Sequence, residues 1–332
     1  MLLVFCSVIH AVIPEKVLIC GVGRDIEKAV PNTTASIEKL GREFLDYTAI
    51  IYENNSKDET RSLLQAWAER NSRVVFISEE LSRKVLAQQL QMKKVTRTEA
   101  IARARNIVLD KAMQPQYDDY KYVIWADLDF LTPWDIDNIV ETILNPEQEW
   151  DAVLGNGAYD LFALRTPMFP IGFELVGKLY WDRLDEIREK FHLDSNGSWV
   201  PVYSAFGGLG IYKREAIQGC SYSGVVTKDL EQSVKSWLAD ASQEVCFFQD
   251  YENLKKETPV IDLKEPFLVR RKKYPDQLGI RLKNGLGVGE IIWFSCTRRD
   301  RLPSTCEHIP FHASMAQKGH EKIFINPRLR SG

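Results

Sequence analysis

Two aspartates, Asp127 and Asp129, stand one residue apart at the end of the apolar run 122–126. Because alternate residues of an extended strand point to the same side, both carboxylates can present oxygens to one point. Mg²⁺ and Mn²⁺ prefer such oxygens, and they commonly keep coordination positions for substrate phosphates. The same spacing also fits two solvated aspartates where a strand enters a loop, so the surrounding elements must decide between the two interpretations.

The first half of the chain alternates predicted strands and helices, which is typical of a mainly parallel sheet with helices on both faces. The sequence therefore predicts an α/β, Rossmann-like fold. Expected apolar helix faces are Ile37, Leu40 and Phe44, then Leu63, Leu64 and Trp67, then Ile101, Ala104 and Val108, then Ile136, Ile139, Val140 and Ile143. Strands are predicted at 16–20, 48–52, 73–77, 122–130 and 151–156.

Polar residues follow the first two strands, at the edge where open α/β sheets bind ligands. Gly21 and Gly23 lead into Arg24, and such a loop lets backbone N–H groups approach a phosphate, although the third glycine of the dinucleotide fingerprint is missing. Glu53 and Asn54 end the second strand. Helix capping does not explain these two residues, whereas Ser56 and Glu59 have capping-box spacing, as do Thr96 and Glu99.

The second half is less regular. The run 206–212 holds three glycines, which permit sharp turns or a close approach of the backbone to a ligand. Residues 174–192 read as an amphipathic helix, 226–300 lack clear periodicity, and a last helix begins near Cys306 and ends at Gly319. We therefore expect a regular α/β half at 14–155 and a less regular half at 156–332, with 226–300 as a candidate insertion.

Composition narrows the class of protein. The 332 residues are 45% hydrophobic and 27% charged, which is ordinary for a globular protein, and the net charge of -3 gives no reason to expect a nucleic-acid partner. The six cysteines are too sparse for a disulfide scaffold. Residues 2–13 are nearly all apolar, interrupted by Ser7 and His10, and too short to span a bilayer. We expect a cytoplasmic protein. A weak signal or a membrane anchor at 2–13 is left open, and so is association with a membrane.

In this order and spacing, the motifs resemble glycosyltransferases of the GT-A fold. The matching elements are the loop at Gly23-Arg24, the run 52–58, the pair Arg105-Asn106 before the D-x-D strand, and a Gly-Gly loop. The runs 52–58 and 206–212 look most like the fungal capsule-associated mannosyltransferase-like family, and more distantly family-2 glycosyltransferases. The resemblance covers roughly 16–220 and 304–328, and it implies a nucleotide-sugar-binding half at 14–155 and an acceptor-binding half at 156–332.

This resemblance implies a metal-dependent transfer of a hexose from a GDP- or UDP-linked sugar to a glycan or glycoconjugate hydroxyl, with mannose favoured. Asp127 and Asp129 would hold Mn²⁺ or Mg²⁺ against the diphosphate, where the metal stabilises the leaving group. The nucleotide-sugar contacts that it implies are Gly23, Arg24, Glu53, Asn54, Arg105 and Asp127, and the acceptor contacts are Gly207 and Gly208.

GT-A enzymes often carry an acidic pair at the place of Glu307, and one member of that pair deprotonates the acceptor. His308 replaces the second member, so the base is either Glu307 or His308. A late histidine completes the metal site in several GT-A families. His312 is the candidate for this metal ligand, and His308 could take the role instead. An equally weighted alternative is that His312 is a helix-surface or core histidine. A zinc site from Cys306, His308 and His312 lacks an obvious fourth ligand.

Two other functions compete with this hypothesis. Sugar-nucleotide nucleotidyltransferases also use metal and carboxylates on a doubly wound sheet, but they usually carry a longer glycine-rich stretch with a lysine than 21–25 provides. A non-catalytic carbohydrate-binding protein on a transferase fold is the other alternative. The presence of both Asp127 and Asp129 argues against it.

Overall fold

The computed structural model describes residues 12–90, 95–145, 147–157, 161–167, 170, 172, 193–240, 260–261, 268–271, 274–283, 289–295 and 304–330. The helix expected at 174–192 and the apolar residues 2–11 lie outside the described residues. No helix in the ranges above has the length and the apolar content that crossing a bilayer requires.

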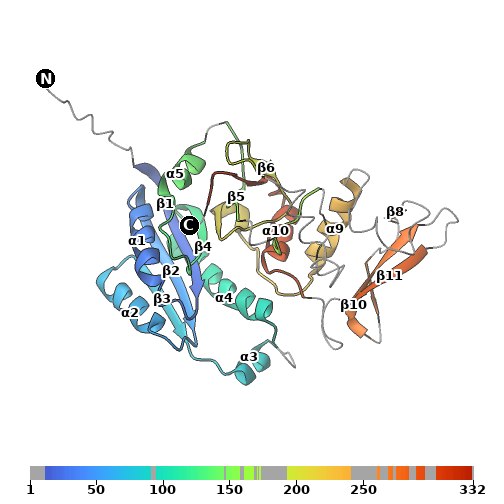
Figure 1. Ribbon diagram of the computed structural model, residues 1–332, viewed down its shortest axis with the longest axis horizontal. Helices are drawn as coiled ribbons and strands as arrows, with labels where there is room; N and C mark the ends of the chain where they lie inside the picture. The colour runs from blue at the N-terminus through green and yellow to red at the C-terminus, as the bar shows by residue number, and fades with distance from the viewer. Residues whose placement is uncertain are drawn as a thin grey trace.

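An eight-stranded sheet in the order β3-β2-β1-β4-β7-β5-β12-β6 forms the centre of the molecule (Figure 1). The pairs β3–β2, β2–β1, β1–β4 and β5–β12 are parallel, and only β6 and β7 run against the other strands of this sheet. The predicted mainly parallel α/β sheet is therefore confirmed. Its strands are β1 (Ile13–Gly23), β2 (Phe44–Asn54), β3 (Val74–Glu79), β4 (Tyr120–Asp127), β5 (Ala152–Leu154), β6 (Val200–Pro201), β7 (Leu209–Lys213) and β12 (Ile323–Ile325).

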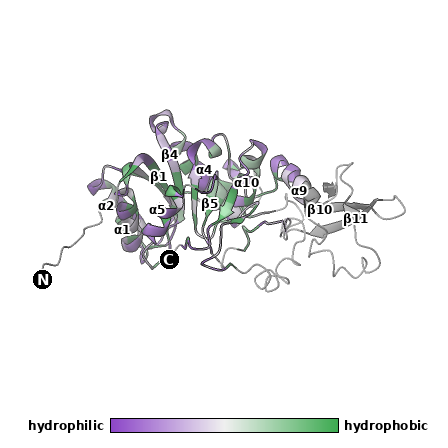
Figure 2. Cartoon of the chain, turned by 90° about the horizontal axis from the view of Figure 1, so that it is seen from above, coloured by the Kyte–Doolittle hydropathy of each residue, from purple (hydrophilic) through white to green (hydrophobic). Residues whose placement is uncertain are grey.

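Helices cover both faces of this sheet and enclose two apolar cores, and the most hydrophobic segments lie along the sheet between them (Figure 2). One core contains buried residues of α1 (Val30–Gly41), α2 (Thr60–Arg70) and α5 (Ile136–Leu144). The other contains buried residues of α4 (Arg97–Ala112), α9 (Lys228–Asp240) and α10 (His308–Gln317). Shorter helical elements are α3 (Arg83–Gln89), η1 (Pro115–Tyr117) and η2 (Arg214–Ile217).

Three local predictions were wrong. Phe44 begins β2 instead of ending a helix, and Leu63 is 38% exposed although its helix buries Leu64 and Trp67. Ser56 and Glu59 form no capping box, because Glu59 itself is the residue that precedes α2 and its side chain makes no cap bond to the helix backbone. The predicted capping box at the start of α4 is confirmed.

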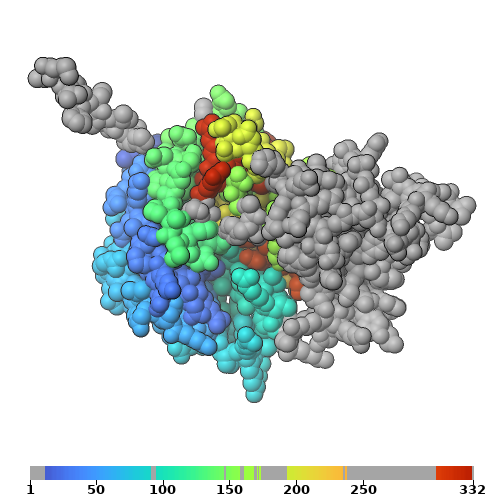
Figure 3. Space-filling view, viewed as in Figure 1, coloured from blue at the N-terminus to red at the C-terminus, as the bar shows by residue number. Residues whose placement is uncertain are grey.

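The C-terminal segment returns to the main sheet. Strand β12 pairs in parallel with β5 and antiparallel with β6, and Figure 3 shows this segment, in red, between the green and yellow parts of the chain. The described residues of the region 226–300 are more regular than the sequence indicated. They contribute α9 and a separate antiparallel sheet of β8 (Val260–Ile261), β9 (Leu268–Arg271), β10 (Tyr274–Lys283) and β11 (Gly289–Ser295).

Candidate active site

The two aspartates flank a buried leucine at the end of β4. Asp127 is the last residue of the strand and its side chain is 28% exposed, whereas Asp129 lies beyond the strand and is exposed. Leu128 between them is 2% exposed and packs over β1, where a Cβ added at Gly21 would lie 2.5 Å from its Cδ2 atom. Gly21 and Gly23 were predicted to form a phosphate loop. Instead both lie within β1, and Gly21 makes room for the leucine that anchors the aspartates.

Arg105 of α4 is the centre of the site. Its guanidinium is buried and donates hydrogen bonds from Nε to Glu307 Oε1 (3.1 Å) and from Nη2 to Asp127 Oδ1 (3.2 Å). Burial opposes its charge, but attraction to Glu307 and then to Asp127 outweighs burial and raises the pKa of Arg105. The Phe206 ring lies 4.8 Å from the guanidinium carbon. Arg105, the predicted diphosphate contact, thus brings together the predicted metal ligand Asp127 and the candidate base Glu307.

Glu307 and His308 sit at the start of α10 in different surroundings. Glu307 is 6% exposed and pairs with Arg105, whereas His308 is 1% exposed and stacks on Phe206 with 3.8 Å between ring centres. Burial, to which the charge of Arg105 adds, lowers the pKa of His308 well below its ordinary value. His308 Nε2 lies 3.6 Å from Glu307 Oε1. His308 is enclosed by its stacking partner, whereas Glu307 shares the Arg105 guanidinium with Asp127, so Glu307 is the better placed candidate for that role.

His312 occupies a structural position away from the aspartates' edge of the sheet. It is fully buried, its Nδ1 is hydrogen-bonded to Ser204 Oγ (2.9 Å), and its Nε2 is hydrogen-bonded to Tyr212 OH (3.0 Å). Burial lowers its pKa to about 3. Both ring nitrogens are therefore already used, which does not support the prediction that His312 is a metal ligand and favours the alternative of a core histidine.

Gly207 and Gly208 form the turn before β7, with φ of +60° and +79°. This left-handed conformation favours glycine, and a Cβ at Gly207 would overlap the backbone of Gly155. The Gly208 carbonyl accepts a hydrogen bond from the Asp127 backbone N–H (2.8 Å). The turn predicted to shape the acceptor site therefore also fixes the backbone of the first aspartate.

The residues predicted to bind the nucleoside lie at one edge of the sheet but face different ways. Gly23 pairs with Glu53, and Val22 pairs with Asp127, so Glu53 and Asp127 project from opposite faces. Glu53 is fully buried and accepts hydrogen bonds from Ser56 N, Arg61 Nε and Ser78 Oγ. Its carboxylate stabilises the loop after β2, and the structure does not bring it to Arg105.

Arg24 and Asn54 remain accessible at that edge, the first with a side chain 52% exposed and the second half-buried. The loops that carry them are joined by reciprocal hydrogen bonds. Asp25 N donates to Ser56 Oγ (3.1 Å), and Lys57 N donates to Asp25 Oδ1 (2.7 Å). The two loops therefore form one surface beside the end of β4.

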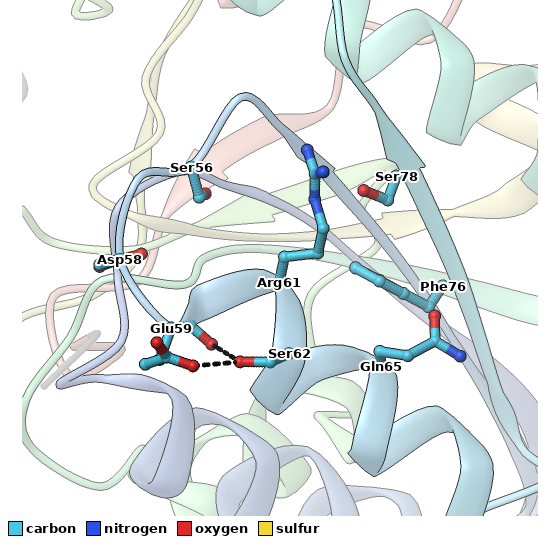
Figure 4. Close-up of a pocket in the computed structure, with 8 residues that line it drawn as sticks. All are labelled: Ser56, Asp58, Glu59, Arg61, Ser62, Gln65, Phe76 and Ser78. Carbon is cyan, nitrogen blue, oxygen red and sulfur yellow. Dashed lines mark hydrogen bonds between the residues drawn. The ribbon is translucent and has the colours of Figure 1, made fainter.

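A pocket of about 470 Å³ lies between the start of α2 and β3 (Figure 4). Its lining includes Arg61, Gln65, Phe76 and Ser78. Arg61 already pairs with Glu53 and Glu80, and Phe76 packs into the core on the α2 face, opposite the core that surrounds Arg105. This pocket is consequently separate from the Arg105 site.

The donor chemistry of Asp127 and Asp129 fits a hard divalent cation, because both present carboxylate oxygens at the end of a strand and both reach solvent. In the described part of the chain, no group of three His, Cys, Asp or Glu side chains converges as metal ligands would. A cation here would therefore take its other ligands from substrate and water, and the zinc site considered at Cys306 is not supported.

Sequence reasoning missed Tyr222, which completes the surroundings of Arg105. Its ring lies 5.7 Å from the guanidinium carbon, and its backbone is held by Asn106, whose amide donates to Tyr222 O (2.9 Å) and accepts from Tyr222 N (2.7 Å). The Arg-Asn pair was a visible signal, but nothing in the sequence identified the partner of Asn106. A second unforeseen group is Arg103 with Glu79 and Tyr52 at the ends of β2 and β3.

No protein-family model matches the chain, and no curated protein matches it. Solved structures do match. The mannosyltransferase PcManGT from Pyrobaculum calidifontis in complex with GDP-Man and Mn²⁺ is 15% identical, with a TM-score of 0.35 over 63% of this chain and 48% of that one. TarS 1–349 from S. aureus is 11% identical, with a TM-score of 0.36 over 68% and 55%.

A third match is glucosyl-3-phosphoglycerate synthase from Mycobacterium tuberculosis in complex with Mn²⁺, UDP and phosphoglyceric acid. It is 14% identical, with a TM-score of 0.34 over 61% of this chain and 57% of that one. The chain thus spans about half the length of the solved chains that it matches. These matches do not show the fungal capsule-associated family, so that resemblance stays a prediction. At these identities and TM-scores, function has to be inferred from the chain's own residues.

Proposed function

We propose that this protein is a metal-dependent GT-A glycosyltransferase that moves a hexose from a nucleoside-diphosphate sugar to a hydroxyl of a glycan or glycoconjugate. GDP-mannose is the favoured donor, with UDP-linked sugars as the alternative. Within the proposal, the parallel strands up to β5 carry the donor half and the later residues carry the acceptor half.

One observation carries the proposal: the bridge that Arg105 makes between Asp127 and Glu307. The two carboxylates that hold this guanidinium lie 22 and 202 residues away along the chain. Burying such charges costs free energy of desolvation, so we infer that the arrangement serves a function. It holds Asp127, the carboxylate proposed for the phosphate side, and Glu307, the proposed base, at a fixed spacing. A transferase that inverts the anomeric centre would need such an arrangement, because its leaving group and attacking hydroxyl lie on opposite faces of the sugar.

Each side chain then has a role. Glu307 accepts the proton of the acceptor hydroxyl, and the oxygen left behind forms a bond to the anomeric carbon. The bond from that carbon to the diphosphate oxygen breaks, and its electron pair leaves with the nucleoside diphosphate. Arg105 holds Glu307 in position and, through its contact with Asp127, places positive charge near the departing phosphates. Asp127 and Asp129 would hold Mn²⁺ or Mg²⁺, which as a Lewis acid would neutralise charge on the diphosphate.

A thermal-shift experiment with GDP and UDP, each with and without Mn²⁺, tests the donor site. Ligands that bind the folded state raise its melting temperature, so we expect a rise that requires Mn²⁺. Asp129→Asn should remove the Mn²⁺-dependent part, whereas the control Asp137→Asn, which changes another exposed aspartate, should keep it. If neither nucleotide stabilises the protein, a non-catalytic carbohydrate-binding function is favoured instead.

A second measurement follows release of the nucleoside diphosphate from GDP-mannose, UDP-glucose and UDP-N-acetylglucosamine. The wild type should release it only with Mn²⁺ or Mg²⁺. Glu307→Gln should slow release by at least a hundredfold while the stabilisation by nucleotide stays unchanged, because general base catalysis typically contributes about 10²–10⁴-fold. If Glu307→Gln loses nucleotide binding instead, Glu307 belongs to the donor site.

A further inference from the structure

Strand β3 is the last strand of the eight-stranded sheet, and one side of its backbone has no neighbouring strand in the described part of the chain. Only alternate residues of a strand bond to a given neighbour. Asn55 N donates to Glu79 O, so the odd-numbered residues of β3 turn their backbone groups toward β2. The backbone N–H and C=O groups of Val74, Phe76 and Ser78 therefore point away from the sheet.

This edge of the sheet lacks the usual protection against a further strand. Edge strands commonly carry a charge, a proline or a bulge, or are very short. Strand β6 at the opposite edge is two residues long and ends in Pro201. The run 74–78 of β3 has neither charge nor proline, pairs with β2 without a register shift, and presents Val75, Phe76 and Ile77 only half-buried. In Figure 1, β3 and α2 lie at the left margin of the molecule, opposite α9.

The backbone of β3 can pair with a second, antiparallel copy of the same strand that is centred on Phe76. Every outward-pointing residue then faces another, so the two Phe76 residues exchange a pair of hydrogen bonds. In each direction, Ser78 N–H reaches Val74 O of the other copy. The N–H of Val74 is already bonded to Asn71 O (3.0 Å), and the remaining outward groups are free to make these bonds within the residues that the structure describes.

The side chains select the same register. Val75 of one copy lies opposite Ile77 of the other, and β-branched pairs of this kind stabilise antiparallel sheets. Arg73 lies opposite Glu79 at both ends of the paired segment. A shift by two residues would bring Glu79 against Val75 in one direction. In the other direction it would bring Arg73 against Ile77, so both shifted registers set a charge against an apolar residue.

The α2 face leaves room for the side chains of a second copy. The pocket of about 470 Å³ is lined by Phe76 and Ser78 of β3 and by Gln65 of α2 (Figure 4). In the antiparallel pair, Val74 of the second copy lies opposite Ser78 on this same face. The place where a paired strand adds its side chains is therefore open.

We propose that β3 is an interface between two copies of this chain, which pair antiparallel about Phe76 and join their sheets into one. The same patch is used on both copies, so the assembly closes as a dimer. Arg73 and Glu79 already have ion partners in their own chain, and they therefore add register more than affinity. Because one short strand and its flanks form the contact, the dimer is weak and depends on concentration. The inference does not depend on the proposed function.

Sedimentation velocity without nucleotide or metal measures the assembly. From about 1 to 200 µM, the wild type should pass from the monomer mass of 38.1 kDa to twice that mass. Ser78→Pro removes an outward N–H and hence two hydrogen bonds per dimer, so dimerisation should weaken about tenfold or more. The matched control Ser78→Ala loses the same hydroxyl bond to Glu53 but keeps the N–H, and it should dimerise as the wild type does.

Cysteine substitution tests the register. Phe76→Cys places two thiols opposite each other across the dimer axis, within reach of a disulfide. The two thiols of Ser78→Cys would be separated by four residues, about 13 Å along the strands, and should not join. Mild oxidation followed by non-reducing electrophoresis compares both variants with the wild type, whose own cysteines give the background.

A protein that stays monomeric over the whole concentration range overturns the proposal and leaves β3 to a different partner. A dimer that survives Ser78→Pro and gives no Phe76→Cys cross-link also overturns it, because its interface lies elsewhere. If Ser78→Pro does not fold, the cross-link of Phe76→Cys against Ser78→Cys decides. Nucleotide binding is measured separately, so failure of the dimer leaves the proposed transferase untouched.

Discussion

Replacing Arg105 by methionine measures how much the buried charge of Arg105 contributes to the free energy of unfolding. Methionine keeps much of the side-chain volume, so the main loss is the pairing with Glu307 and Asp127. The Glu307 side chain is 8% exposed and is left as a buried charge, whereas Asp127, at 28%, stays partly solvated. Breaking a buried ion pair by removing one partner costs about 3–5 kcal/mol, and we expect Arg105→Met to lose that much.

Two further variants make this prediction specific. Arg103→Met removes another arginine of α4, but its partner Glu79 is 33% exposed, so the expected loss in the free energy of unfolding is only about 0–1 kcal/mol. In the double variant Arg105→Met/Glu307→Gln no buried carboxylate is left without a counter-charge. It should therefore be more stable than Arg105→Met alone, with a coupling energy of about 2 kcal/mol.

Urea unfolding at pH 7 without divalent cations measures the free energies of five proteins: the wild type, the single variants Arg105→Met, Arg103→Met and Glu307→Gln, and the double variant. The linear dependence of the free energy of unfolding on urea gives each value directly. Additive losses in the double variant, within about 0.5 kcal/mol, would refute the reasoning, because residues in one ion-pair network should not behave independently. Equal losses for Arg103→Met and Arg105→Met would refute it as well.

Two other predictions concern the scaffold. The unfolded chain binds a proton on His312 near pH 6.5 and the folded chain only near pH 3, so this residue alone should lower the free energy of unfolding by about 2 kcal/mol between pH 6.5 and 5. Burial also lowers the pKa of His308, which adds a loss of the same sign. His312→Asn should therefore remove only the His312 share of this pH dependence in urea unfolding, and an unchanged slope would contradict the assignment. Gly207→Ala should lower the melting temperature far more than Gly319→Ala. Both glycines have positive φ, but an added Cβ overlaps Gly155 only at the first and meets nothing within 4 Å at the second. Equal shifts would contradict this.

The fold could be predicted largely because local signals agreed with one another. Apolar periodicity gave the alternation of strands and helices, and the face Ile136, Ile139, Val140 and Ile143 is buried as expected. One error arose where two elements adjoin, at Phe44, which continues an apolar period into the next strand. The antiparallel insertion of β7 between β4 and β5 has no local signature, because strand order depends on which edges remain open after the other strands pair.

The candidate site was only partly accessible to sequence reasoning. Arg105, Asp127 and Glu307 came from motifs and do meet. Glu53 and His312 have the right residue types, but the pleat turns one to the opposite face of the sheet and packing encloses the other. Motif spacing records which residues are near a strand end, whereas side-chain direction and burial follow from the whole assembly. Tyr222 was missed for the same reason, since its role depends on Asn106 across 116 residues.

The 202 residues between Arg105 and Glu307 also have a consequence for synthesis on the ribosome. Strands β1 to β4 belong to the first 127 residues and can pair with one another while later residues are still being added. At about 5–20 residues per second, Glu307 emerges roughly 10–40 s after Arg105. Throughout this interval the nascent chain carries the carboxylates proposed to bind the metal but not the proposed base. Under the proposed function it becomes competent for transfer only when α10 docks.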